Sequence, residues 1–102
     1  MGYAWRMMKL EKTDKYQDWF TGLSDKLVKA RIEARIRRLQ DGNPGDVEPA
    51  GEGVSELKLH FGSGWRVYYT ERNGQIIILL AGGNKSTQKR DIKLALTLAR
   101  NL

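Results

Sequence analysis

The chain has 102 residues, 40% of them hydrophobic, and this length can bury one modest core without room for a second domain. It contains no cysteine, which excludes a disulfide framework and thiolate metal sites, and its apolar runs fall far short of the roughly 20 residues of a membrane-spanning helix. Eighteen Lys and Arg against twelve Asp and Glu give a formal net charge of +6, which favours a polyanionic partner such as nucleic acid. We expect one cytoplasmic domain over 1–102, with 1–8 as a candidate N-terminal extension and no association with membranes.

The first half of the chain has the spacing of a short strand followed by two helices. The strand is predicted over Tyr3–Glu11, and aromatic residues then recur at helical spacing from Asp14 onward. Gly22 should end this helix, and Ser24 should cap a second helix over 24–41. The second helix is clearly amphipathic, and its basic side indicates plain solvation more often than a binding surface. Its apolar stripe consists of Val28, Ile32, Ile36 and Leu39.

The middle of the chain changes from helical to strand-like patterning. Both prolines and several glycines fall within 42–53, which predicts an irregular surface loop. Residues 54–61 and 65–72 then alternate between apolar and polar side chains, as half-buried strands do. The short Gly-Ser-Gly segment at 62–64 separates them, so we predict a β-hairpin with a three-residue turn.

The last third predicts one more strand and one more helix. Asn73-Gly74 is typical of a type I′ turn, and the strand after it, 75–81, is apolar on both faces and should be internal. The glycines at 82 and 83 should end this strand, and Ser86 or Thr87 should cap the final helix. Its predicted core-facing residues are Ile92, Ala95, Leu96, Ala99 and Leu102.

One face of the predicted hairpin gathers polar side chains. A three-residue turn would place His60 opposite Arg66 and Lys58 opposite Tyr68. Like charges on neighbouring strands repel, so a face with several cations indicates a binding or catalytic task; alternatively, Glu56 neutralises Lys58 and the face is merely solvated. Because Arg66 alternates with Val67, we expect its side chain on the solvent side, where its removal should leave the fold intact.

Other kinds of site find little support. The single histidine cannot form a usual zinc set, and no acidic pair has the spacing of a calcium loop or a two-metal nuclease, so we expect neither a metal nor a cofactor. The segment 82–86 lacks the spacing of a phosphate-binding P-loop. Lys85 and Lys89 lie near the start of the last helix, where backbone N–H groups attract phosphate, although this segment also fits ordinary capping.

Two motifs give the sequence a resemblance to a known family. They are G-x-G-x-R-V-Y at 62–68 and G-G-x-K-S-T-Q-x-x-D-I at 82–92. In combination they resemble the RelE/ParE superfamily, and specifically its HigB-like "addiction module killer protein" branch, with the match running from about Trp19 to the end. The resemblance implies a compact α+β fold in which an antiparallel β-sheet packs with two N-terminal helices and a C-terminal helix.

The same resemblance implies a function and its partners. The chain would be the toxin of a type II toxin-antitoxin module, a metal-independent endoribonuclease that cleaves mRNA in the ribosomal A site. A HigA-like antitoxin with a helix-turn-helix would neutralise it, and we expect an acidic or amphipathic segment of that partner to cover the basic sheet face or the helix over 24–41.

The resemblance also assigns roles to particular residues. Arg66, Lys85 and Lys58 match basic residues of the RelE site and would stabilise the phosphate. The sequence departs from the family at two positions, because a RelE lysine falls near Glu56 and the RelE tyrosine falls near Asp91. Proton transfer therefore stays open among four residues, namely Glu56, His60, Tyr68 and Asp91. The predicted RNA contacts are Lys58, Arg66, Lys85, Gln88 and Lys89.

Two other classes of function remain open at this point. A ParE-like toxin poisons DNA gyrase by binding alone, and the basic hairpin residues would then be contacts rather than catalysts. A nucleic-acid-binding module or an antitoxin-like regulator without enzymatic activity is the other reading. The set of Lys58, Arg66 and Lys85 favours the ribonuclease.

Overall fold

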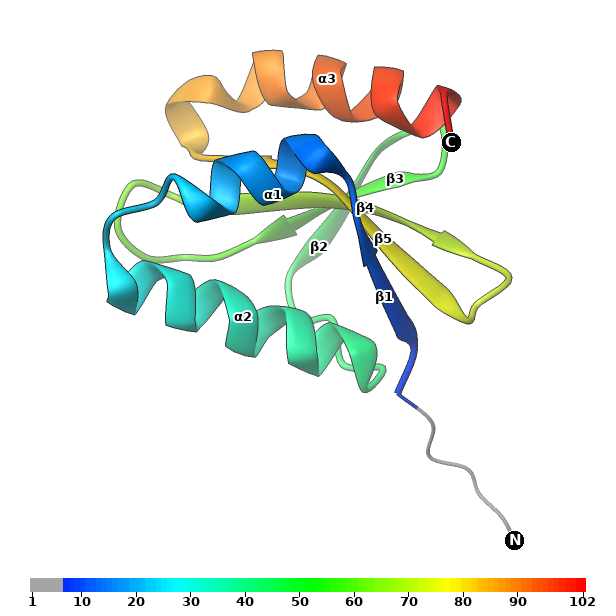
Figure 1. Ribbon diagram of the computed structural model, residues 1–102, viewed down its shortest axis with the longest axis horizontal. Coiled ribbons are helices and arrows are strands. Elements are labelled where there is room, and N and C mark those ends of the chain that lie inside the picture. Colours follow the sequence, from blue (N-terminus) through cyan, green and yellow to red (C-terminus); the bar gives the residue numbers. More distant parts are fainter. Residues whose placement is uncertain (1–6) are drawn as a thin grey trace, which may run out of the picture.

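A computed structural model describes residues 7–102, which form a five-stranded sheet with helices on both faces (Figure 1). The strand order is β1-β5-β4-β3-β2; β1 runs parallel to β5, and the other neighbouring strands are antiparallel. The predicted compact α+β fold, with two N-terminal helices and one C-terminal helix, is confirmed. The elements are β1 (Lys9–Lys12), α1 (Asp14–Thr21), α2 (Lys26–Gln40), β2 (Val47–Gly51), β3 (Val54–Lys58), β4 (Arg66–Arg72), β5 (Ile76–Gly83), a 3-10 turn (Lys85–Thr87) and α3 (Gln88–Arg100).

The two helical layers bury different residues of the sheet. Helices α1 and α2 cover one face, where Ile32 of α2 packs in one cluster with Leu57, Val67 and Leu79 of the strands. Helix α3 covers the opposite face, where Ala95 packs against residues that include Tyr68 and Leu80. None of the helices within 7–102 is long and apolar enough to cross a membrane.

The N-terminal elements begin close to their predicted positions. Strand β1 covers Lys9–Lys12, while residues 3–6 of the predicted first strand lie outside the described part of the chain. Helix α1 is capped by Thr13, whose hydroxyl accepts a hydrogen bond from the Tyr16 N–H at 3.1 Å. Helix α2 is capped by Asp25 and not by Ser24, because the Asp25 carboxylate accepts hydrogen bonds from two backbone N–H groups of the first turn.

The segment 42–53 is more ordered than its composition suggested. Instead of an entirely irregular loop, it contains β2, which pairs with β3 at the edge of the sheet. Pro49 is compatible with this place, because an edge strand needs ladder hydrogen bonds on one side only, and the register shifts between Pro49 and Gly51. The prediction of a loop here was wrong because the pairing with β3 overrides the local turn preference.

The predicted hairpin register is also wrong, by two residues. Strand β3 ends at Lys58, which pairs with Arg66, while Glu56 pairs with Tyr68. The connection therefore spans 59–65, and the Leu59 N–H donates to the Trp65 carbonyl at 2.9 Å across it. Leu59 points into the core, and the chain leaves the strand earlier and turns more broadly than a turn of the three residues 62–64 would require.

The turn at Asn73-Gly74 is confirmed, because both residues have positive φ and the Gln75 N–H donates to the Arg72 carbonyl at 2.9 Å. Strand β5 lies between β1 and β4, as predicted for an apolar internal strand. It does not end before the glycines, however, but continues through Gly83.

The two glycines permit close packing from both layers. A Cβ at Gly82 would lie 2.2 Å from the Trp19 ring of α1, and a Cβ at Gly83 would lie 1.8 Å from the Asp91 carboxylate of α3. At the C-terminal helix, Thr87 occupies the N-cap position without a capping bond, and its hydroxyl donates to Asp91 at 2.5 Å instead. Leu102, predicted to face the core, is 49% exposed.

Candidate functional site

A buried polar network lies between the sheet and the start of α3. The Glu56 carboxylate accepts hydrogen bonds from Arg66 Nε at 2.7 Å and from Gln88 Nε2 at 2.8 Å. The Tyr68 hydroxyl lies 3.4 Å from the same oxygen. Glu56 is 5% exposed and Arg66 is 9% exposed, so this ion pair has little access to water. The two side chains neutralise one another and satisfy each other's polar groups in the interior.

This burial overturns the expectation that Arg66 points into solvent. The strand alternation places it opposite to Val67, as predicted, but α3 covers that face as well. Removing Arg66 would therefore leave the Glu56 charge without its main partner. Burial and the negative charge of Glu56 raise the pKa of Tyr68 far above its usual range, so its hydroxyl stays protonated.

An open depression of about 510 Å³ lies beside this network, at the end of the sheet. Lys58 and Arg66 reach it from the ends of β3 and β4, and Lys85 reaches it from the turn after β5. The Arg66 Nη1 donates to the Gly64 carbonyl at 2.6 Å, and the Lys85 N–H donates to the Ser63 carbonyl at 3.2 Å. These two hydrogen bonds hold the connection between β3 and β4 against Arg66 and Lys85, and this connection forms the wall of the depression.

Acidic residues near β2 pair with two of the site's basic side chains. Glu48 forms an ion pair with Lys58, and Asp46 hydrogen-bonds to His60 Nε2. The contact with His60 lowers the pKa of Asp46, and the contact with Glu48 raises the pKa of Lys58. These pairs are more exposed than the Glu56–Arg66 pair, so solvent and salt weaken them and a bound anion can compete for the basic side chains.

The structure sorts the predicted site residues by their access to this depression. Lys58, His60, Arg66 and Lys85 line it together. Glu56, Tyr68 and Gln88 lie behind Arg66 in the buried network, and Asp91 is 4% exposed with Thr87 as its hydrogen-bond donor. Lys89 is exposed on α3 and does not line the depression.

Sequence reasoning missed Asp46, Glu48 and Arg35. The two acids lie in the segment that was predicted to be a loop, although their spacing of two residues is what one face of a strand would show. Arg35 of α2 donates to the Lys58 carbonyl at 2.5 Å and to the Pro44 carbonyl at 2.9 Å. It thereby ties the second helix to the end of β3, a long-range contact that no local pattern reveals.

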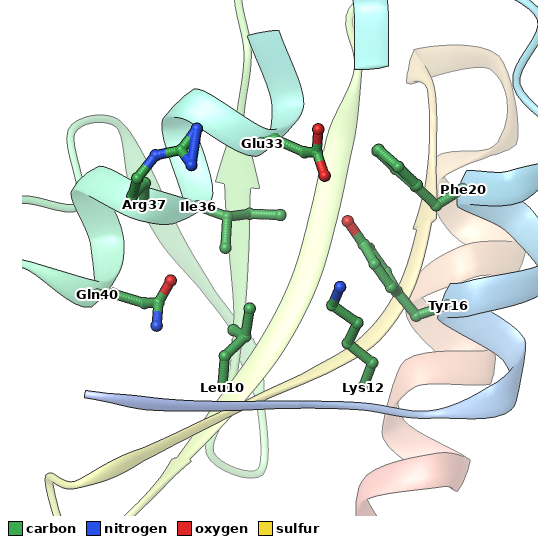
Figure 2. Close-up of a pocket in the computed structure, with 8 residues that line it drawn as sticks. All are labelled: Leu10, Lys12, Tyr16, Phe20, Glu33, Ile36, Arg37 and Gln40. Carbon is green, nitrogen blue, oxygen red and sulfur yellow. The ribbon is translucent and has the colours of Figure 1, made fainter. Parts of the chain in front are cut away.

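A smaller cavity of about 100 Å³ lies on the opposite face of the sheet, between β1, α1 and α2 (Figure 2). The Tyr16 hydroxyl points into it toward Glu33, and burial raises the pKa of this tyrosine well above its usual range. At about 30 Å³ per molecule, the cavity has room for a few waters and is much smaller than a typical ligand pocket. Within 7–102, no group of three His, Cys, Asp or Glu side chains is arranged to hold a metal ion.

Comparisons with known proteins relate the chain to one family. Residues 18–101 match the family described as "Phage derived protein Gp49-like (DUF891)". An uncharacterized protein of Haemophilus influenzae is 44% identical over 95 residues, which cover 93% of this chain and 96% of the relative.

Solved structures of RelE share the fold despite low sequence identity. A double mutant of the E. coli toxin RelE in the free state superimposes with a TM-score of 0.69 at 14% identity, covering 90% of this chain and 97% of RelE. A chain of the E. coli RelBE toxin-antitoxin complex gives a TM-score of 0.62 at 15% identity, covering 76% of this chain and 95% of the other. Identities this low establish a RelE-like fold and nothing about chemistry.

Proposed function

We propose, because this chain belongs to the phage-derived Gp49-like family and has a RelE-like fold, that it is the toxin of a type II toxin-antitoxin pair that cleaves mRNA. The observation that carries the proposal is the convergence of Lys58, Arg66 and Lys85 on one depression from three separate segments of the chain. Three cations around an open hollow favour a phosphate-bearing substrate. Membership of the narrower HigB-like branch is part of the same proposal.

The chemistry requires charge stabilisation and two proton transfers. The RNA 2′-hydroxyl loses a proton and its oxygen attacks the adjacent phosphorus, and the 5′-oxygen leaves with the electron pair of the broken P–O bond and gains a proton. Arg66, Lys58 and Lys85 would stabilise the negative charge of the phosphorane. Arg66 is held in place by Glu56, so its guanidinium needs little reorganisation when substrate binds.

Burial narrows the four candidates for proton transfer. Glu56, Tyr68 and Asp91 are each at most 5% exposed and engaged in hydrogen bonds within the protein. The His60 side chain is 71% exposed and lines the depression. Its Nε2 faces the Asp46 carboxylate, and a proton shared there leaves the lone pair of Nδ1 free to accept another. We assign proton transfer to His60 and assign to Asp46 the task of orienting it.

The partners follow from the same proposal. The RelBE structure is that of a toxin bound to its antitoxin, which supports a protein antitoxin for this chain, here a HigA-like protein with a helix-turn-helix. The substrate is mRNA in the ribosomal A site. A ribosome would supply orientation, which by itself can account for about 7–11 kcal/mol of a reaction barrier.

Lys85 offers the cleanest test of the assignment. Its side chain is exposed, and no ion pair or side-chain hydrogen bond joins it to the described part of the chain, so Lys85→Ala should leave the fold unchanged. Lys93→Ala is the matched control, because it removes the same charge from an exposed position of α3 outside the depression.

We expect induction of the wild-type protein to arrest growth, and co-expression of the protein encoded beside it to restore growth. Primer extension on cellular mRNA should reveal cleavage that Lys85→Ala lowers by roughly 10²–10³ and Lys93→Ala leaves nearly unchanged. Equal cleavage by both variants would refute the site. DNA breaks that depend on gyrase, without mRNA cleavage, would assign the protein to the ParE-like class instead.

A further inference from the structure

A second hollow, of about 260 Å³, lies between α2 and the connection that follows β3. Its helix side carries three arginines at positions i, i+4 and i+7, a spacing that aligns side chains along one side of a helix. Its other side shares residues with the depression lined by Lys58, Arg66 and Lys85, which we call the cleavage depression. The two hollows therefore adjoin along the β3–β4 connection. The arginines are Arg31, Arg35 and Arg38, and the shared residues are Leu59, His60 and Phe61.

The three arginines differ in their hydrogen-bond and ion-pair partners. Arg35 donates to three backbone carbonyls, those of Pro44, Asp46 and Lys58, and so forms part of the wall. Arg31 and Arg38 are exposed, and within 7–102 neither is paired with a carboxylate. By contrast, Lys58 and His60 in the adjoining depression already have acidic neighbours. The second hollow therefore concentrates positive charge that the described chain does not neutralise.

An aromatic ring at the shared rim adds a surface for a flat group. The Arg31 guanidinium lies over the Phe61 ring, 4.8 Å from its centroid, so two flat groups lie together at the edge of the hollow. Proteins bind single-stranded RNA with this combination of aromatic or guanidinium planes for bases and free cations for phosphates. The volume lies just below the roughly 300 Å³ at which small-molecule pockets begin, which is compatible with one base.

We propose that this hollow is a second RNA subsite, in which a base next to the cleaved phosphate stacks on Arg31 and Phe61 and a flanking phosphate binds Arg38. The inference rests on the proposed function in its choice of ligand, because the RNA strand would pass from the cleavage depression over His60 into the hollow. Arg35 positions the two walls and makes no contact with RNA.

Binding to a non-cleavable RNA tests the subsite separately from catalysis. The probe is a fluorescein-labelled, single-stranded decamer with 2′-O-methyl groups, which lacks the attacking hydroxyl, and fluorescence anisotropy is measured over a series of salt concentrations. The variants are Arg31→Ala, Arg38→Ala and Phe61→Leu. Arg37→Ala is the matched control, because this neighbouring arginine of the same helix lines the small cavity on the side of β1.

We expect Arg38→Ala to weaken binding roughly tenfold at low salt and to reduce the slope of log affinity against log salt by about 0.7. Phe61→Leu should weaken binding roughly fivefold without changing the slope, since it removes a stacking surface and no charge. Arg31→Ala should show both effects, and Arg37→Ala should change affinity less than twofold. Circular dichroism and a thermal melt of each variant confirm that the fold is retained.

Equal losses for Arg38→Ala and Arg37→Ala would overturn the subsite, because they would indicate general electrostatic attraction. Unchanged RNA affinity together with weaker binding of the protein encoded beside this gene would also overturn it and make the hollow a protein interface. A failure of the subsite proposal can be distinguished from a failure of the proposed function. Cleavage of mRNA by the wild type can persist without the expected binding pattern, and the binding pattern can appear in a protein that cleaves nothing.

Discussion

The layer between the sheet and the helices α1 and α2 buries apolar and aromatic side chains, whereas the layer between the sheet and α3 also buries three charged residues, Glu56 and Arg66 of the strands and Asp91 of α3. Both faces belong to the same strands, whose alternate residues point to opposite sides except where the register between β4 and β5 shifts. The face beneath α3 adjoins the depression lined by Lys58, Arg66 and Lys85, and the buried Glu56 holds Arg66 at the edge of that depression. A buried ion pair is weak evidence for stability, since apolar residues of similar volume often serve as well or better. Charge on this one face therefore indicates a requirement of the site.

Among variants that distinguish the two faces, Arg66→Ala should have the largest effect on stability. The variant leaves Glu56 buried without its cation and should lower the free energy of unfolding by about 3–5 kcal/mol in a urea titration. The double variant Glu56→Leu/Arg66→Met should regain only part of this loss, because it also removes the acceptor of Gln88 and of the Tyr68 hydroxyl, and it should abolish mRNA cleavage. If the double variant is no more stable than the single one, the loss does not come from the unpaired charge of Glu56.

The adjacent glycines of β5 allow the same substitution, Gly→Ala, to be made once toward each face of the sheet. A methyl group at Gly82 would meet Trp19 and a methyl group at Gly83 would meet Asp91, so each Gly→Ala variant should lose about 1–3 kcal/mol of stability. Only Gly83→Ala should also reduce mRNA cleavage, because it displaces the start of α3 beside the site. Thermal melts and primer extension on both variants test this, and equal cleavage would show that the site tolerates movement of α3.

Alkaline pH should lower the stability of the protein through buried tyrosines on both sides of the sheet. Burial raises the pKa of Tyr16 and of Tyr68 above the ordinary value near 10, so the unfolded chain loses these protons first as the pH rises. The stability is fully present below pH 10 and should fall above it, by up to about 1.4 kcal/mol per pH unit for each tyrosine.

Urea titrations between pH 8 and 11 should show a shallower decline for Tyr16→Phe and for Tyr68→Phe than for the wild type. The double variant should keep part of the decline, because burial also raises the pKa of Tyr69. A decline that is unchanged in all variants would mean that other groups set the alkaline limit.

The smallest effect should come from an ion pair at the exposed end of α3. Arg100 Nε and Nη2 donate to the Glu52 carboxylate at 2.8 and 2.6 Å, yet both side chains are at least half exposed. Solvent screens such a pair, so Glu52→Gln should leave the urea midpoint nearly unchanged at low and at high salt. A loss comparable to that of Arg66→Ala would contradict the view that burial, and not the contact itself, gives the Glu56–Arg66 pair its importance.

Patterns that involve only near neighbours in sequence were predicted well. The apolar stripe of α2 is buried at Val28, Ile32, Ile36 and Leu39, because helical spacing alone puts these residues on one side. Asn73-Gly74 adopts the expected turn because both residues tolerate positive φ. The internal position of β5 followed from its two-sided apolar character.

The errors arose where a distant contact decides the outcome. Strand β2 forms because β3 is available to pair with it, and at the end of β3 the distant Arg35 of α2 donates to the Lys58 carbonyl, where the predicted strand would have continued. The glycines at the end of β5 looked like a strand terminus, although they make room for Trp19 and Asp91.

By itself, the sequence determined most of the elements, because periodicity and turn chemistry are properties of the chain. Its two motifs, through the family resemblance that they carry, supplied the fold class and the candidate set Lys58, Arg66 and Lys85. Only the tertiary structure decided which of the candidate site residues reach solvent. Burial depends on what covers a strand, and α3 covers Glu56, Tyr68 and most of Arg66 while leaving His60 and Lys85 open. The pairing of Asp46 with His60 likewise exists only because β2 folds against β3 and brings residues 14 positions apart into contact.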